Sequence, residues 1–249
     1  MSTMTIDFGA TDIAAKLKLQ SEPFNEPKEF RWTREAYYQL ESLGFFTDKK
    51  VELLNGEIIN RNDADNYRWT RSECYKLEDS GFFRNTKIEL IDGRIIEMSP
   101  IYSPHATTVT LVGEALRAAF GNEYHVREQG PLDVDESNDP LPDIAVVKGK
   151  IRDFKDHHPS DAALIVEVSD STLRYDQRKK ASLYARQGIQ DYWIVNLKNR
   201  QVEVYRVPVE DSSAAFWHSY ADVQIFTEEN SLSPLAQPTA VVAVADLLP

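Results

Sequence analysis

Two acidic residues and a lysine form the pattern in this sequence with the clearest chemical potential. Asp143 follows a proline and opens the apolar run DIAVV, Glu167 interrupts the apolar run LIVEVS, and Lys180 follows in the next predicted helix. Two unpaired carboxylates held at close range repel each other and resist ionisation. Because burying an unpaired charge is costly, Glu167 is expected to have a partner, either a cationic side chain or a metal ion.

A divalent cation would relieve the repulsion between the two acids. Mg²⁺ prefers oxygen ligands, retains several waters, and commonly binds one or two carboxylates together with a substrate phosphate. Such an ion lowers the pKa of a bound water and neutralises charge that develops on a phosphorus centre. The pattern is therefore compatible with metal-assisted chemistry, in which Lys180 would orient the water or stabilise the transition state. The alternative is structural, with the acids acting as strand-end caps or in surface ion pairs.

A sheet and a helix are needed to bring these residues together. DIAVV and AALIVEVS have the length and the β-branched content of buried strands, and STLRYDQRKKASLYARQG predicts a helix that ends at Gly188. A hairpin is predicted from YWIVNL to QVEVYRV, and a helix over residues 105–119. Adjacent strands would place Asp143 and Glu167 at one edge of the sheet. The fold class is α/β or α+β with a mixed sheet, and residues 208–240 are expected to be irregular surface.

The chain also contains an internal duplication. Residues 31–59 and 68–96 are identical at sixteen of 29 aligned positions. Each copy predicts one helix, with Thr33 or Thr70 as its N-cap, followed by a hairpin whose turn is Asn-Gly or Asp-Gly. Two copies are too few for a solenoid, so a local duplication is the simpler explanation.

Four segments, in this order and spacing, carry a resemblance to a known family. They are IELIDGRIIEMSP, SPHATTVTLVGEAL, LPDIAVVKG and ALIVEVSDSTLRYDQRKKASLYARQGIQDYWIVNL. The sequence resembles the Uma-two family of restriction-endonuclease-like proteins, within the PD-(D/E)XK nuclease superfamily, over about residues 67–207. The resemblance implies a mixed four-stranded sheet flanked by helices and hydrolysis of phosphodiester bonds with Mg²⁺ or Mn²⁺. Residues 66–249 would form the restriction-endonuclease-like domain, 28–65 an appendage with the first repeat copy, and 1–27 a flexible arm.

The resemblance also assigns roles to single residues of the acid and lysine pattern. Asp143 matches the aspartate of the PD motif and Glu167 matches the second acid, both as catalytic metal ligands. The lysine expected two residues after the second acid is absent, since Ser169 stands there. In this family the lysine is displaced into the next helix, which points to Lys180 as the catalytic lysine that activates the water and to Lys179 as the next candidate.

Further candidates come from the segments that precede the acid pair. Glu89 matches a family glutamate that would be an additional metal or water ligand, and its alternative is an outward residue paired with Lys87. His105 matches a family histidine that would contact phosphate or water, and its alternative is an ordinary helix cap. Glu114 is the alternative first acid. Only the second repeat copy runs directly into the helix as the family pattern does, so Glu89 is assigned to the site and its twin Glu52 is not.

Charge distribution bears on the expected partner. The chain has a net charge of −12, which opposes sequence-independent attraction to nucleic acid. Residues 148–188 nevertheless contain nine basic and six acidic residues, so a polyanion is expected to bind there, unless the run is only a solvated helix face. Together with the resemblance, this predicts nucleic acid as the partner, DNA in preference to RNA, with Arg174, Arg178 and Lys179 approaching the phosphates.

Several classes of protein lose support from the composition. The chain contains one cysteine, and its first thirty residues lack the features of a secretory signal, so a cytoplasmic protein is expected. No apolar stretch is long enough to span a bilayer, so no membrane span is expected. P-loop, CxxC, HExxH and Gly-x-Ser-x-Gly motifs are absent.

Exposed hairpin edges would permit a homodimer by strand pairing. The main alternative to a nuclease is a binding or regulatory module that keeps the fold without the chemistry and acts through a protein partner. A glycosidase acid pair is weaker, since no aromatic sugar platform is evident.

Overall fold

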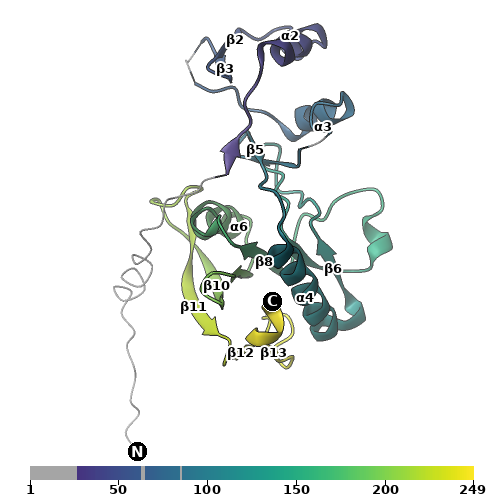
Figure 1. The fold of residues 1–249 in the computed structure, drawn as a ribbon, viewed down its shortest axis with the longest axis vertical. Coiled ribbons are helices and arrows are strands. Elements are labelled where there is room, and N and C mark those ends of the chain that lie inside the picture. Colours follow the sequence, from purple (N-terminus) through teal and green to yellow (C-terminus); the bar gives the residue numbers. More distant parts are fainter. Residues whose placement is uncertain (1–26, 63–64, 85) are drawn as a thin grey trace, which may run out of the picture.

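The computed structural model describes residues 27–62, 65–84 and 86–249. The arm expected over residues 1–27 lies outside these ranges except for Pro27. The described residues form two connected parts, a module of two helix-hairpin copies and a sheet with helices on both faces (Figure 1). Within these ranges, no helix combines the length and the apolar character that a membrane span needs.

A six-stranded mixed sheet forms the centre of the larger part, in the order β11-β10-β9-β8-β7-β6. Its strands are β6 (Tyr124–Glu128), β7 (Ile144–Lys148), β8 (Leu164–Ser169), β9 (Asp191–Asn196), β10 (Gln201–Glu210) and β11 (His218–Thr227). β8 and β9 run parallel, and the other neighbouring pairs are antiparallel. The expected mixed sheet is therefore confirmed, with six strands where the resemblance implied four.

The expectation that residues 208–240 form irregular surface is wrong. β10 continues to Glu210, and β11 pairs with it as a ten-residue edge strand. A short ribbon of β12 (Ser231–Leu232) and β13 (Val242–Ala243) follows. Because an edge strand is only partly covered, β11 mixes buried Tyr220 with exposed Ile225 and polar residues, and it lacks the continuous apolar run that marks β8.

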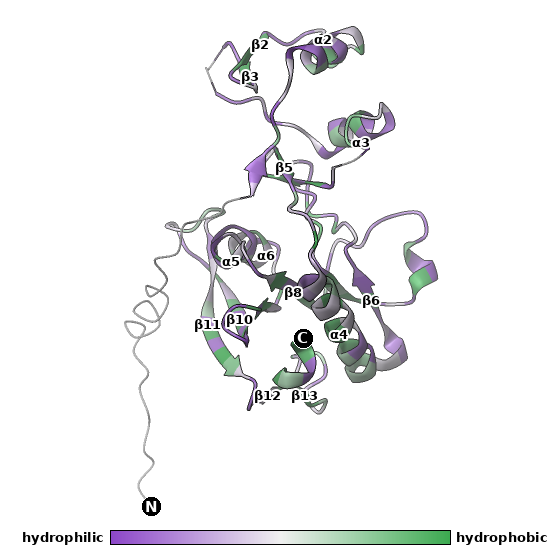
Figure 2. Ribbon diagram, viewed as in Figure 1, coloured by the Kyte–Doolittle hydropathy of each residue, from purple (hydrophilic) through white to green (hydrophobic). Residues whose placement is uncertain are grey.

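Helices cover the two faces of the sheet, and β8 lies between them (Figure 1). On one face lie α4 (Ser103–Phe120) and the C-terminal 3₁₀ turn η4 (Val244–Leu247). On the other face lie α5 (Leu173–Tyr175), the π-helical turn η3 (Asp176–Lys180) and α6 (Ala181–Arg186). The helices α2, α3 and α4 carry both hydrophobic and hydrophilic residues, as expected for helices with one buried face (Figure 2).

Strand alternation decides which face receives the two acids. Ile144 of β7 packs in the core under α4, whereas Ala145 packs in the core under α6. Side chains two residues apart share a face of a strand. Asp143 therefore belongs to the α6 face, and so does Glu167, which lies two residues beyond Ile165 in the α6 core. The lysine-bearing helix covers the same face.

Both repeat copies adopt the predicted helix and hairpin. The first copy contains α2 (Arg34–Ser42), β2 (Val51–Leu54) and β3 (Glu57–Asn60), and the second contains α3 (Arg71–Asp79), β4 (Ile88–Ile91) and β5 (Arg94–Glu97). Thr33 and Thr70 are the N-caps, and each accepts a hydrogen bond from a backbone N–H in the first turn. Positive φ angles at the Asn-Gly and Asp-Gly positions give the expected tight turns.

The two copies pack against each other around a shared aromatic core. Trp32 and Trp69, which occupy equivalent positions, are both buried and their ring centroids lie 5.0 Å apart. The single cysteine, Cys74, is buried in the same core. The first copy therefore buries the apolar side of the second copy within the same chain.

Backbone pairing between the copies is reciprocal. Phe30 N–H donates to Ile95 O across 2.8 Å, and Tyr67 N–H donates to Ile58 O across 2.7 Å. Phe30 and Tyr67 occupy equivalent positions just before the two copies, and Ile95 and Ile58 occupy equivalent positions in the two hairpins. The segment that precedes each copy therefore pairs with the hairpin of the other copy. In addition, β1 (Lys28–Glu29) pairs antiparallel with β5. Through these contacts the first copy supports the hairpin that carries Glu89.

Candidate active site

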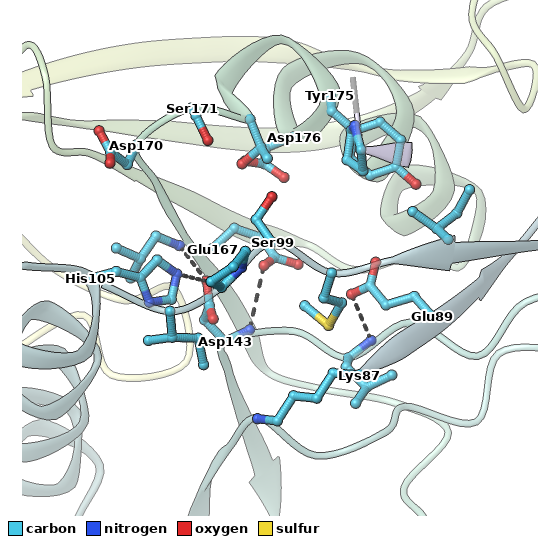
Figure 3. A pocket seen from close by; sticks show the side chains of 18 of the residues that line it. Lys87, Glu89, Ser99, His105, Asp143, Glu167, Asp170, Ser171, Tyr175 and Asp176 are labelled. Carbon is cyan, nitrogen blue, oxygen red and sulfur yellow. Dashed lines mark hydrogen bonds and ion pairs between the residues drawn. The ribbon is translucent and has the colours of Figure 1, made fainter. Parts of the chain in front are cut away.

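The chemistry-bearing residues line one pocket between the module and the sheet (Figure 3). The hairpin β4–β5 and the connection 98–102 form one wall. The start of β7, the end of β8, the segment α5–η3 and the first turn of α4 form the rest. Its polar lining includes Glu89, His105, Asp143, Glu167, Asp170, Asp176 and Lys180.

Asp143 and Glu167 are brought together by the pairing of β7 with β8. Ile144 lies opposite Val166 in the antiparallel ladder, so the residue before β7 faces the end of β8. Asp143 Oδ2 accepts a hydrogen bond from the Val168 N–H at 2.9 Å, and Asp143 N–H donates to Glu167 Oε2 at 3.4 Å. Both side chains are buried. The structure thus places the two predicted acids side by side.

Lys180 points at the acids and not into solvent. Its Nζ donates to Glu89 Oε1 at 2.8 Å and to Glu167 Oε1 at 3.0 Å. Burial alone would lower the pKa of Lys180, but the carboxylates of Glu167, Glu89 and Asp176 more than offset this, so its pKa is raised well above the usual value. Burial raises the pKa of Glu167, and the attraction of Lys180 opposes that rise only in part.

Glu89 joins the site through the second repeat copy. Besides Lys180, its Oε1 accepts a hydrogen bond from the Leu141 N–H at 3.1 Å. The alternative partner Lys87 donates instead to Gln129 Oε1 at 3.1 Å. The twin Glu52 lies in the first copy, where it is largely exposed and pairs with Arg61 at 3.3 Å. The question of which repeat copy supplies the pocket glutamate is therefore answered in favour of Glu89.

This difference between the twins gives a matched test. Glu89→Gln removes a charge that faces Lys180, so we expect the phosphodiester cleavage that the resemblance implies to fall about ten- to a hundredfold. Glu52→Gln changes an exposed ion pair and should leave activity within about twofold. Cleavage rates of the two variants, measured beside the parent protein, make the comparison. Equal losses in both variants, or none in Glu89→Gln, would contradict the assignment.

His105 lies at the start of α4 against the acid pair. Its Nε2 is 3.2 Å from Asp143 Oδ2. Burial lowers the pKa of His105, but the hydrogen bond to Asp143 and the negative charge of that carboxylate outweigh burial, so its pKa is raised. Within the described ranges, the buried Nδ1 of this ring has no hydrogen-bond partner. His105 is therefore not the cap of α4, whose N-cap is Tyr102 without a side-chain cap hydrogen bond, and it contacts Asp143 of the acid pair instead.

Two further polar residues belong to the site and were not among the predicted ones. Tyr184 of α6 donates its hydroxyl to Glu167 Oε1 at 2.8 Å. Asp176 is buried in η3 and lines the pocket, and the Thr172 hydroxyl donates to its Oδ2 at 2.8 Å. Asp176 precedes Lys180 by four residues, so its spacing could have signalled a shared helix face once Lys180 was chosen.

The other predicted residues lie elsewhere. Glu114, the alternative first acid, is exposed on α4, away from the pocket lining. Arg174 and Arg178 are exposed and Lys179 is half-buried, and none of these three lines the pocket as the described residues form it. They share the helical segment of Lys180 but are more exposed than Lys180.

The site contains more buried carboxyl groups than basic groups. If its four buried acids were all ionised, Lys180 and a protonated His105 would still leave two negative charges. Burial raises the pKa of Asp176 to about 7, while Lys180 and the hydrogen bond from Thr172 oppose the rise. The four acids are Glu89, Asp143, Glu167 and Asp176.

The donor set agrees in part with a magnesium site. Carboxylate oxygens are the ligands that Mg²⁺ prefers, and one or two protein carboxylates suffice when waters and a phosphate complete the shell. Asp143 and Glu167 supply such a pair. Within the described part of the chain, no three His, Cys, Asp or Glu side chains converge as a preformed metal cage. The residues therefore fit an open ion site with two protein ligands, and they do not fit a closed structural one.

Comparison with solved structures bears on the fold. A crystal structure titled as that of “a putative nuclease belonging to DUF820” from Anabaena variabilis ATCC 29413 is similar to the chain, with a TM-score of 0.51 and 14% identity. The match covers 65% of this chain and 89% of that chain. At this identity it shows the fold alone, an α+β fold of the kind that this nuclease structure has.

The family follows from the sequence itself. The Uma2 family, described as “Putative restriction endonuclease”, matches residues 71–245. This range covers well over half of the chain, so the protein belongs to the Uma2 family and the expected resemblance is confirmed. No curated protein matches the chain. Membership in this family, together with the fold, supports a nuclease function.

Proposed function

We propose that the protein is a nuclease that hydrolyses phosphodiester bonds of DNA with Mg²⁺ or Mn²⁺. The observation that supports this most directly is the ion-pair bridge of Lys180 between Glu167 and Glu89, beside Asp143, at the base of one pocket. A lysine on an outward face would have favoured a binding module without chemistry. The excess of buried carboxylates supports the metal requirement, because a divalent cation would neutralise it.

Each residue has a proposed task. Asp143 and Glu167 would hold the cation, which supplies Lewis-acid polarisation of the phosphate and neutralises charge in the transition state. Lys180 holds Glu167 and Glu89 in place and balances their charge. His105 keeps Asp143 in position through Nε2 and, as the family pattern implies, would contact phosphate or water.

DNA contacts are proposed for the outer side of the same helical segment. Arg174, Arg178 and Lys179 lie close in sequence to Lys180 and provide positive charge in a chain whose net charge is −12. Neutralising each of these residues should weaken binding and reduce its salt dependence, since Lys and Arg contacts to phosphate release counterions.

A metal-dependent cleavage screen tests the proposal. Plasmid DNA, linear duplex, single-stranded DNA and RNA are incubated with the full chain and Mg²⁺, Mn²⁺ or EDTA, and Mg²⁺ binding is measured separately by calorimetry. We expect ion binding and cleavage of a DNA form that EDTA abolishes. Retention of DNA without cleavage would favour the binding or regulatory module, and absence of both ion binding and cleavage would overturn the nuclease.

A further inference from the structure

Lys180 is not suited to act as the base that accepts the proton of the attacking water. Lys180 is buried, donates to two carboxylates, and has a raised pKa, so it holds its proton and has no lone pair to accept another. Glu167 accepts hydrogen bonds from Lys180 and Tyr184. Glu89 accepts from Lys180 and a backbone N–H. Lys180, Glu167 and Glu89 are thus linked by hydrogen bonds, with Lys180 as the donor to both acids.

The carboxylate of Asp143 is also engaged in contacts. Its Oδ2 accepts from the Val168 N–H and contacts His105, and the proposed function assigns it to the cation. Asp176 differs from these acids. The neutral hydroxyl of Thr172 donates to its Oδ2, and no ion pair between Asp176 and a cationic side chain is found in the described structure. In Figure 3 its carboxylate points into the pocket, toward the acid pair.

The backbone around Asp176 fixes the position of this carboxylate. Asp176 opens the π-helical turn η3, and its N–H donates to Thr172 O at 3.1 Å. Its carbonyl accepts a hydrogen bond from the Tyr192 hydroxyl at 3.1 Å. Single π-helical turns inside α-helices are often found at functional sites. Here the turn places Asp176 and Lys180 together in the pocket lining.

We propose that Asp176 accepts the proton of the attacking water, and that Lys180 positions the carboxylates without acting as the base. The inference rests on the proposed nuclease function. One O–H bond of water breaks and its proton goes to the Asp176 carboxylate, while the water oxygen uses its electron pair to bond to phosphorus. The bond from phosphorus to the leaving oxygen breaks, and that oxygen takes a proton from solvent.

The proton affinity of Asp176 suits this task. Burial raises its pKa to about 7, Lys180 and the hydroxyl of Thr172 lower it, and the charge of Asp143 raises it. A general base is most effective when its pKa lies near the working pH. The titratable groups around it are Asp143, Glu167, Lys180, His105, Tyr175, Tyr192 and Tyr205.

The test compares Asp176→Asn and Thr172→Val with the parent protein. The parent rate should rise with pH as Asp176 loses its proton, at or below about pH 7, because a bound cation can only lower its pKa. Asp176→Asn should reduce kcat by about a hundredfold or more and abolish this rise, with the Mg²⁺ affinity measured by calorimetry changed less than about threefold. Thr172→Val removes a hydrogen bond to the carboxylate and should shift the rise to higher pH.

Several outcomes would overturn the inference. Parent-like kcat in Asp176→Asn would do so, and so would a loss of Mg²⁺ affinity large enough to explain the lost activity, which would make Asp176 a metal ligand. An unshifted pH profile in Thr172→Val would leave Asp176 with a structural role only. A parent protein that cleaves no nucleic acid with any metal would instead overturn the proposed function, and the inference with it.

Discussion

Asp143→Asn is expected to reduce nuclease activity by about a thousandfold or more while the fold is retained. Asparagine has nearly the same shape, and its carbonyl oxygen can still accept the hydrogen bond from the Val168 N–H. The variant loses the negative charge that would hold the cation and that pairs with His105. Cleavage rates and Mg²⁺ calorimetry measure the loss, and thermal unfolding shows whether the fold persists.

Glu114→Gln is the matched control for this experiment. Glu114 was the alternative first acid, and the structure places it exposed on α4, outside the lining of the pocket. Its replacement should leave both cleavage and ion binding within about twofold. If Asp143→Asn kept a tenth of the parent activity, or if the two variants lost activity equally, the acid pair would not be the metal site.

The elements of the fold that could be predicted from the sequence are those that short-range residue patterns specify. The Asn-Gly and Asp-Gly turns and the threonine caps of the repeat are local signals, and the structure bears both out. β7 and β8 were recognisable as continuous apolar runs because helices cover both faces of these strands. β11 was missed because it lies at the edge of the sheet, where solvent permits polar residues along the strand.

The second acid of the site was predictable because it interrupts a buried apolar run. Glu167 follows three apolar residues in β8, a strand that is buried along its whole length, and a buried carboxyl group requires a partner. The identity of the partner of Glu167 depends on contacts between segments that are far apart in the sequence. Lys180 reaches Glu89 across 91 residues of sequence, and the hairpin that carries Glu89 is positioned by contacts between repeat copies. Residue spacing alone cannot show such a contact.

Asp176 illustrates the remaining gap. The stretch from Arg174 to Lys180 contains four basic residues besides this aspartate, and such a stretch is typical of a solvated helix face. Only the π-helical turn and the covering hairpin make this aspartate a buried residue of the pocket. The same features turn Lys180 inward while Arg178 stays exposed. Helix periodicity could suggest that residues 176 and 180 share a face, but it could not identify that face as the buried one.

Lys180→Met is expected to destabilise the protein by about 3–5 kcal/mol at pH 8. Methionine fills similar volume but leaves Glu167 and Glu89 buried without their cation. Without the cation, the pKa of Glu167 would rise further, so the folded variant would bind protons more readily than the unfolded chain. Stability should then increase as pH falls, and most of the deficit should disappear by about pH 5. Urea unfolding at the two pH values measures this.

Lys179→Met provides the control, because this neighbouring lysine is half-buried and outside the pocket lining. We expect a change within about 0.5 kcal/mol at both pH values. The contrast separates loss of a lysine from the helix from loss of the cation that balances the buried acids. A deficit in Lys180→Met that is equal at pH 5 and pH 8 would show that packing, and not charge compensation, is the main contribution of Lys180 to stability.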